Sequence, residues 1–130
     1  MENKEERRPR LVELRRFLDP RGNLSVIEQL QDAPFKIERC YWVYDVPGGD
    51  SREGHAYRRN EEMIVALSGS FEVMTSVDGE ERVFTLNRCY EGLYIPAGVW
   101  RELRNFSTNS VAMVVASRHY EEDDYIFEKI

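Results

Sequence analysis

The chain has 130 residues, two cysteines and a net charge of −6 at pH 7. This length suits one domain with its own buried core, and the acidic balance argues against general nucleic-acid binding, which needs a basic face. Segment 1–14 lacks the apolar core of a signal peptide, and no apolar run approaches the ~20 residues of a membrane helix. We therefore expect a cytoplasmic protein without a membrane span, whose cysteines stay reduced.

Short segments rich in β-branched and aromatic residues recur along the chain, with turn signals between them. The segments expected as strands are 10–17, 23–29, 39–46, a stretch around His55, 63–69, 70–77, 81–86, 92–96, 100–106 and 111–117. Segment 63–69 is almost wholly apolar and should be buried on both faces, and Asp78-Gly79 predicts a tight hairpin. Only 120–130 could form a short helix. This rhythm, without linker or repeat, predicts one all-β domain over 1–130, a sandwich or barrel.

The stretch GHAYRRNEEMIVALSG holds a histidine, a glutamate and a glycine at a characteristic spacing. His55 and Tyr57 are two residues apart, so they share a face if the segment is a strand. Glu62 follows after four residues and Gly69 after six more. The stretch resembles the first motif of the cupin superfamily, and segment 96–105, PAGVWRELRN, resembles the second. The resemblance implies a cupin, a jelly roll of the double-stranded β-helix type.

Two departures from the metal-binding cupins bear on whether this chain holds a metal. Those proteins supply three histidines and a glutamate, but Tyr57 and Arg101 stand at two of the histidine positions here. A first-row divalent ion prefers several imidazoles and a carboxylate, and arginine adds a permanent positive charge, so we predict no metal. With Arg52, Arg58 and Arg59, Arg101 indicates an anion such as phosphate near the barrel mouth. One of the two adjacent arginines is then a solvated strand end, because neighbours in a strand point oppositely.

The whole chain is similar to the sugar-nucleotide 3,4-ketoisomerases of the cupin superfamily, the WxcM-like family. The matching pieces, in the family's order, are DPRGNL, IERCYWVYDV, REGHAYRRNEEMIVALSGSFEV, LNRCYEGLYIPAGVWRELRNFS and VAMVVASRHYEEDDYI. The resemblance implies that the keto group of dTDP-4-keto-6-deoxyglucose moves from C4 to C3, for dTDP-3-amino sugars of glycans such as lipopolysaccharide. The family motif is R-G-x-H-A-H; here Glu53 replaces the glycine and Tyr57 replaces the second histidine.

Such an isomerisation needs acid–base catalysis and no redox cofactor: a base removes the C3 proton, and the resulting enediol is reprotonated at C4. His55 is the expected base, by its match to the family histidine and because imidazole titrates near neutrality. The resemblance places Tyr41 in the active site, where it would hydrogen-bond the enediolate or relay a proton. Tyr57 would donate in place of the missing histidine, because a phenol donates well but is a poor base at neutral pH.

Each of these three residues also has a structural interpretation. A lone histidine in a strand is commonly structural or exposed, and His119 has only this interpretation. Tyr41 and Tyr57 could be ordinary strand packing. Glu62 is expected to be the buried partner of an arginine.

The arginines are the expected substrate-binding residues. The resemblance places Arg21 near the substrate, with turn capping as the alternative. Arg52, Arg59 and Arg101 are assigned to the substrate, the first and last of them to the nucleotide diphosphate. The acidic run 121–124 is expected to be a solvated end.

Two further functions remain open. One is a catalytically silent cupin that binds a nucleotide sugar, which the replacement at Tyr57 allows; the other is a sugar epimerase of the 3,5-epimerase type, whose longer chain matches poorly. The product of the isomerase could be the gluco or the galacto epimer. A homodimer is expected from the resemblance, and the apolar residues of 10–17, which are Leu11, Val12, Leu14 and Phe17, need a surface to cover.

Overall fold

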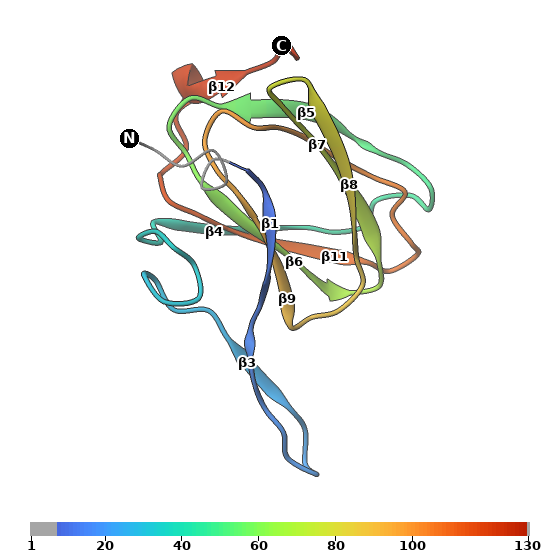
Figure 1. The fold of residues 1–130 in the computed structure, drawn as a ribbon. Coiled ribbons are helices and arrows are strands. Elements are labelled where there is room, and N and C mark those ends of the chain that lie inside the picture. The colour runs from blue at the N-terminus through green and yellow to red at the C-terminus, as the bar shows by residue number, and fades with distance from the viewer. Residues whose placement is uncertain (1–7, 130) are drawn as a thin grey trace.

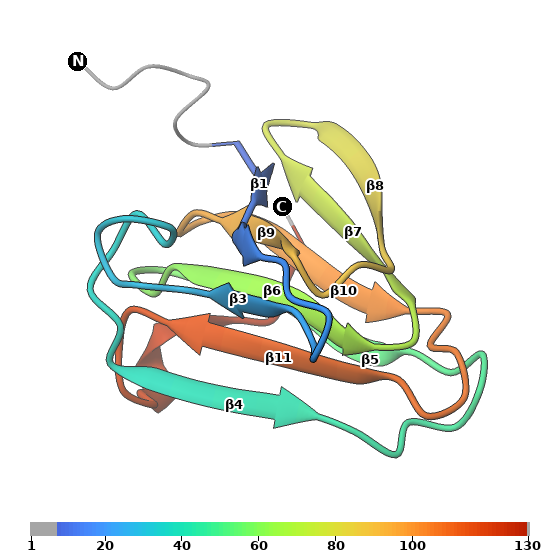
Figure 2. The same ribbon diagram turned by 90° about the horizontal axis from the view of Figure 1, so that it is seen from below.

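The computed structural model describes residues 8–129, which form two five-stranded antiparallel sheets and a separate two-stranded hairpin (Figures 1 and 2). The first sheet has the order β1 (Arg10–Glu13), β9 (Glu91–Ile95), β6 (Glu62–Ser68), β11 (Val111–Ala116) and β4 (Arg39–Val43). The second has the order β12 (Tyr125–Ile126), β5 (Arg52–Tyr57), β10 (Trp100–Arg104), β7 (Phe71–Val77) and β8 (Glu80–Leu86). The predicted all-β class is confirmed, and within the described residues no helix is long and apolar enough to cross a membrane.

The core lies between the two sheets because each contributes apolar side chains to one cluster. Ile64 of β6 and Val114 of β11 meet Phe71 and Val73 of β7 there. The other face of β6 is also buried, since Val65 packs in a second cluster under segment 27–37. Burial of β6 on both faces, predicted from its apolar run, is therefore confirmed.

The hairpin predicted at Asp78-Gly79 joins β7 to β8. Asp78 has φ 51° and Gly79 has φ 77°, and two positive φ values are the signature of the tight turn whose twist matches antiparallel strands. Segment 10–17, predicted as one strand, is two. Leu14 turns into the core between β1 and β2 (Arg15–Phe17), with 3% of its surface exposed, and β2 pairs instead with β3 (Leu24–Val26).

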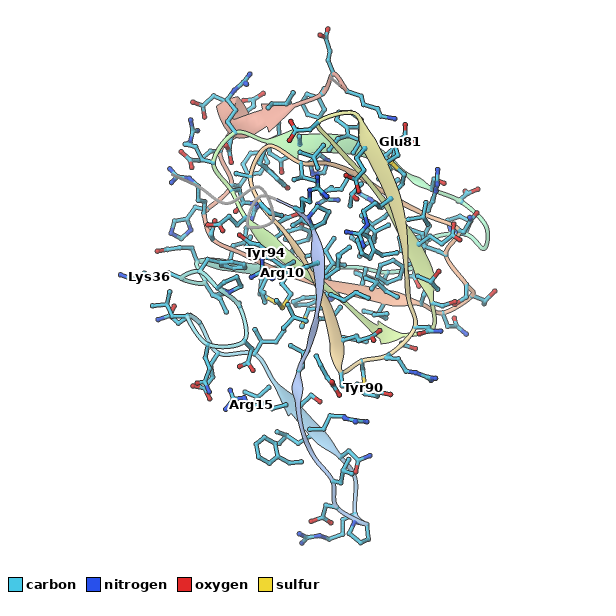
Figure 3. The ribbon with its side chains drawn as sticks, viewed as in Figure 1. Arg10, Arg15, Lys36, Glu81, Tyr90 and Tyr94 are labelled. Carbon is cyan, nitrogen blue, oxygen red and sulfur yellow. The ribbon has the colours of Figure 1, made fainter. Side chains whose placement is uncertain are left out.

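The β2–β3 hairpin projects from the body of the molecule (Figure 1). Arg15 lies at its base (Figure 3) and holds it to the following loop, because its Nη2 donates to Asp32 at 2.6 Å and to Glu28 at 3.2 Å. Phe17, at the far end of β2, is about half exposed.

The expected helix near the C-terminus is a single 3₁₀ turn, Glu122–Asp124, followed by β12. β12 adds to the edge of β5, with Tyr125 opposite Tyr57 (Figure 1). The chain forms a strand here because the edge of β5 offers backbone hydrogen-bonding groups that a terminal helix would leave unpaired.

Candidate active site

A cavity of about 550 Å³ opens between the sheets, and β4, β5, β10, β11 and the C-terminal segment line it. Val43, Leu103 and Val114 form its apolar inner wall. The remaining lining side chains are mostly arginines and aromatic rings, including His55 and Tyr57. The sequence therefore places a titratable imidazole in a concave site that also holds cations and hydroxyls, as ligand pockets commonly do.

His55 and Tyr57 share one face of β5, as their spacing predicts. Their ring centroids are 4.9 Å apart with the planes nearly perpendicular, at 82°, a favourable edge-to-face arrangement. Both line the cavity. Position 54 is a glycine because a Cβ there would lie 2.4 Å from Glu102 Cγ and 2.6 Å from the Trp100 ring. The side chains of Glu102 and Trp100 on β10 therefore lie against Gly54, the residue before His55.

A buried polar network forms the floor of the cavity. Arg101 Nη2 donates to one carboxylate oxygen of Glu62 at 2.6 Å, and the Tyr41 hydroxyl donates to the other at 2.6 Å. Arg101 Nη2 also lies 3.1 Å from the Tyr41 oxygen and donates to it. Glu62 is 1% exposed and Arg101 is 5% exposed. The prediction that Glu62 is the buried partner of an arginine is confirmed.

The environment keeps both phenols protonated. Burial raises the pKa of Tyr57, and the negative charge of Glu62 raises it further. Burial and the same carboxylate raise the pKa of Tyr41. Burial would lower the pKa of Arg101, but the charge and hydrogen bond of Glu62 together with the neighbouring Tyr41 and Tyr57 outweigh it, and the net shift is upward. At neutral pH the two tyrosines are therefore donors, which leaves His55 as the candidate base.

The donor set does not fit a divalent cation. Glu62, the carboxylate of the first motif, already accepts hydrogen bonds from Arg101 and Tyr41, and a cation beside the guanidinium would be repelled. Among the described residues there is no group of three or more His, Cys, Asp or Glu side chains placed to hold a metal ion. The prediction of a site without metal rests on this chemistry and awaits measurement.

The predicted arginines fall in different places. Arg52 and Arg101 line the cavity. Arg59 does not; it pairs with Glu121, Asp123 and Asp124 at 3.2–3.7 Å. Arg58, next to it, is also exposed and donates to a backbone oxygen of the C-terminal segment at 3.2 Å. The last two arginines thus hold the chain end to the β5–β6 turn, and neither faces the cavity of this chain.

Arg21 lies at the tip of the β2–β3 hairpin. Its backbone N–H donates to Asp19 at 2.8 Å, and its side chain donates to the same carboxylate at 2.9 and 3.0 Å. With its side chain 90% exposed, Arg21 has the turn-capping contacts given above as the alternative. Within one chain the structure does not bring it to the cavity.

Two further cavity residues, Arg39 and Tyr125, were missed from the sequence. Arg39 Nε is buried and has no hydrogen-bond partner among the described residues. Strand periodicity could have found Arg39, because it stands two residues before Tyr41 on β4 and shares its face. Tyr125 carries no such signal, since only the pairing of β12 with β5 brings it to the site.

The acidic run 121–124 is not simply a solvated end, and in this respect the prediction was wrong. Asp124 is 2% exposed. Its carboxylate accepts the backbone N–H groups of Arg59 at 2.7 Å and Asn60 at 3.2 Å. A buried carboxylate of this kind is tolerated because backbone donors satisfy it, and it fixes the segment that carries Tyr125.

Two antiparallel sheets around a cavity with one imidazole, protonated phenols and arginines define a cupin with an acid–base site. The chain belongs to the WxcM-like family: residues 7–129 match the family model described as FdtA, WxcM-like, C-terminal. It is 36% identical over 126 residues to the TDP-4-oxo-6-deoxy-alpha-D-glucose-3,4-oxoisomerase of Aneurinibacillus thermoaerophilus, covering 97% of this chain and 86% of the relative.

Solved structures agree. A histidine-to-asparagine variant of the 3,4-ketoisomerase QdtA from Thermoanaerobacterium thermosaccharolyticum, in complex with TDP-4-keto-6-deoxyglucose, superposes with a TM-score of 0.89 at 32% identity, covering 92% of this chain and 87% of that one. The WlaRB TDP-quinovose 3,4-ketoisomerase from Campylobacter jejuni also has a TM-score of 0.89 at 32% identity, covering 92% of each chain. The expected cupin fold is confirmed by these likenesses.

Proposed function

We propose that this protein is a 3,4-ketoisomerase that converts dTDP-4-keto-6-deoxyglucose to a dTDP-3-keto-6-deoxyhexose. The observation that carries the proposal is one imidazole, His55, in a cavity beside two phenols, Tyr41 and Tyr57, that burial keeps protonated. The isomerisation needs one base and one acid, and the cavity offers both. The names of the relatives support the same substrate.

The reaction follows from these residues. His55 removes the proton from C3, and the electron pair passes through a C3–C4 double bond to O4. The O3 proton moves to O4, the ketone forms at C3, and Tyr57 protonates C4. Arg101, in the floor of the cavity, stabilises the enediolate: its contacts with Glu62 and Tyr41 hold the guanidinium in place, and its buried Nε–H has no hydrogen-bond partner among the described residues.

The diphosphate of the nucleotide binds at the arginine side of the cavity. Arg39 and Arg52 both line it, and the guanidinium fork matches phosphate oxygens. Arg101 is the weaker candidate for this role because Glu62, at 2.6 Å, balances its charge. We assign Arg101 to the sugar end and the two outer arginines to the diphosphate.

We further propose that the protein is a homodimer built on the β2–β3 hairpin. Of the apolar residues in 10–17, Leu14 and Val12 pack within their own chain. Phe17 at 54%, Leu18 at 72% and Leu24 at 57% stay exposed. A second copy offers matching surface on the outer face of the first sheet, where Trp42, Tyr44 and Leu67 are about half exposed; a two-fold pairing covers both patches at once.

In a dimer of this kind we expect the tip of the hairpin, which carries Arg21, to lie on the partner. Light scattering should report twice the chain mass at micromolar concentration. Phe17→Ser with Leu24→Ser should release monomers, and a wild-type monomer would contradict the dimer.

Incubation with dTDP-4-keto-6-deoxyglucose, followed by NMR of the sugar ring, tests the activity. A 3-keto product establishes the isomerase, and its C4 configuration decides between the gluco and galacto epimers. Binding of dTDP without turnover would instead favour a silent nucleotide-sugar cupin, the alternative that Tyr57 leaves open. A change of configuration at C3 and C5 without movement of the ketone would favour an epimerase.

A further inference from the structure

Tyr125 packs against His55 and Tyr57 of the first motif, although it comes from the far end of the chain. Its ring centroid is 5.1 Å from that of His55 and 4.8 Å from that of Tyr57. Its hydroxyl is 3.5 Å from the Tyr57 hydroxyl, which donates to it. This separation is long for a hydroxyl pair, but catalytic hydrogen bonds of this kind shorten when substrate is in place.

The position of Tyr125 is fixed by its neighbours. Tyr125 pairs with Tyr57 across the β12–β5 ladder. Asp124, the residue before it, holds the turn after β5: its carboxylate binds the N–H groups of Arg59 and Asn60, and its carbonyl accepts the Arg58 N–H at 2.8 Å. A hydroxyl held in this way is suited to proton transfer, because little reorganisation is needed.

Tyr57 is poorly placed to carry the negative charge that remains after it donates its proton, and a proton from Tyr125 can neutralise that charge. Tyr57 is only 5% exposed, and burial beside Glu62 raises its pKa. Once it has given its proton to the sugar, a tyrosinate in this environment is strongly disfavoured. Tyr125 is more exposed than Tyr57 and lines the cavity, so it stands between the buried phenol and water.

We propose that Tyr57 and Tyr125 form a two-step proton relay, which takes the role of the second histidine of the family motif and rests on the ketoisomerase function proposed above. As the Tyr57 O–H bond breaks, its proton forms the C4–H bond with an electron pair of the enediolate. In the structure Tyr57 donates to Tyr125, so for this step both hydroxyls rotate: Tyr57 turns its proton to C4, and Tyr125 donates to Tyr57 oxygen. The electron pair left on Tyr57 oxygen takes the Tyr125 proton, and water reprotonates Tyr125. His55 returns to water the proton that it took from C3, so protons balance.

The test is Tyr125→Phe, which keeps the ring against His55 and Tyr57 and removes only the hydroxyl. The protein is incubated with dTDP-4-keto-6-deoxyglucose in D₂O, and NMR follows loss of the C3 proton and formation of the 3-keto product separately. We expect product formation to fall ~10-fold or more, since a general acid contributes ~10²–10⁴ and water replaces part of it. Exchange at C3 should change less than about 2-fold, because His55 carries it out.

A double variant separates a relay from simple packing. In Tyr57→Phe with Tyr125→Phe, product formation should fall no further than in Tyr57→Phe alone, because the two hydroxyls act in series. Tyr120→Phe is the matched control: its ring lies 5.6 Å from Tyr125, it is 65% exposed, and it should behave as wild type.

Three results would overturn the relay. They are full product formation by Tyr125→Phe, an equal fall in exchange and product formation, and additive losses in the double variant. Each leaves the isomerase intact if the wild type is active. A wild type that neither exchanges the C3 proton nor forms product would overturn the proposed function and the relay together.

Discussion

Replacing Glu62 by glutamine tests how the floor of the cavity is held together. The substitution keeps the shape of the side chain and removes its charge. Its amide oxygen can still accept from Arg101, and its NH₂ group can face the Tyr41 oxygen. The glutamine cannot, however, balance the positive charge of Arg101, which is only 5% exposed. The raised pKa of Arg101 means that the guanidinium cannot lose its proton instead.

The size of the effect follows from this burial. Removing one partner of a buried ion pair costs about 3–5 kcal/mol. We expect the lower end, about 3 kcal/mol, because glutamine retains hydrogen bonds. For a domain of this length 1 kcal/mol corresponds to roughly 3–5 °C in Tm. The Tm of Glu62→Gln should therefore lie about 10 °C below that of the wild type.

Calorimetry or circular dichroism during heating measures this shift, and two further variants give it meaning. Glu62→Gln with Arg101→Met removes both charges and should recover most of the lost stability, since an apolar replacement of a buried pair is often neutral. Arg104 lies on the same strand as Arg101, and Arg104→Gln breaks an exposed 3.9 Å pair with Glu72. This control should change Tm far less than Glu62→Gln does. A Glu62→Gln protein as stable as wild type, or a double variant less stable than the single one, would refute this account.

Three other outcomes are expected. His55→Asn should still bind dTDP but exchange the C3 proton ~10²–10⁴-fold more slowly in D₂O; exchange near the wild-type rate would assign the base elsewhere. Arg39→Ala and Arg52→Ala should each weaken dTDP binding by about 1.5–3 kcal/mol in calorimetry, whereas Arg59→Ala should not. If Arg39→Ala and Arg52→Ala bind dTDP as tightly as the wild type, the diphosphate does not bind at these two arginines. Elemental analysis of protein purified without added metal should find no stoichiometric transition metal, and activity that is lost to a chelator would contradict this.

Much of the fold can be predicted from local sequence patterns. The apolar run of β6 predicted burial on both faces, and Asp78-Gly79 predicted the β7–β8 hairpin, because these features depend on residues that are neighbours in the chain. The shared face of His55 and Tyr57 follows from strand periodicity alone. The resemblance to a family added the role of the histidine, which periodicity does not supply.

Other parts of the site were decided only by the tertiary structure. Tyr125 and Asp124 stand in an acidic run that has the composition of a solvated end, yet Asp124 is buried and Tyr125 contacts His55. Arg59 was expected from the sequence to bind the anionic substrate, yet it pairs with that same acidic run, 62–65 positions away in the chain. These outcomes depend on pairing between β5 and β12, strands that are distant in the chain. The free energy of that pairing lies in backbone hydrogen bonds and buried carboxylate contacts between the two segments, and no periodicity within either segment records which partner it will meet.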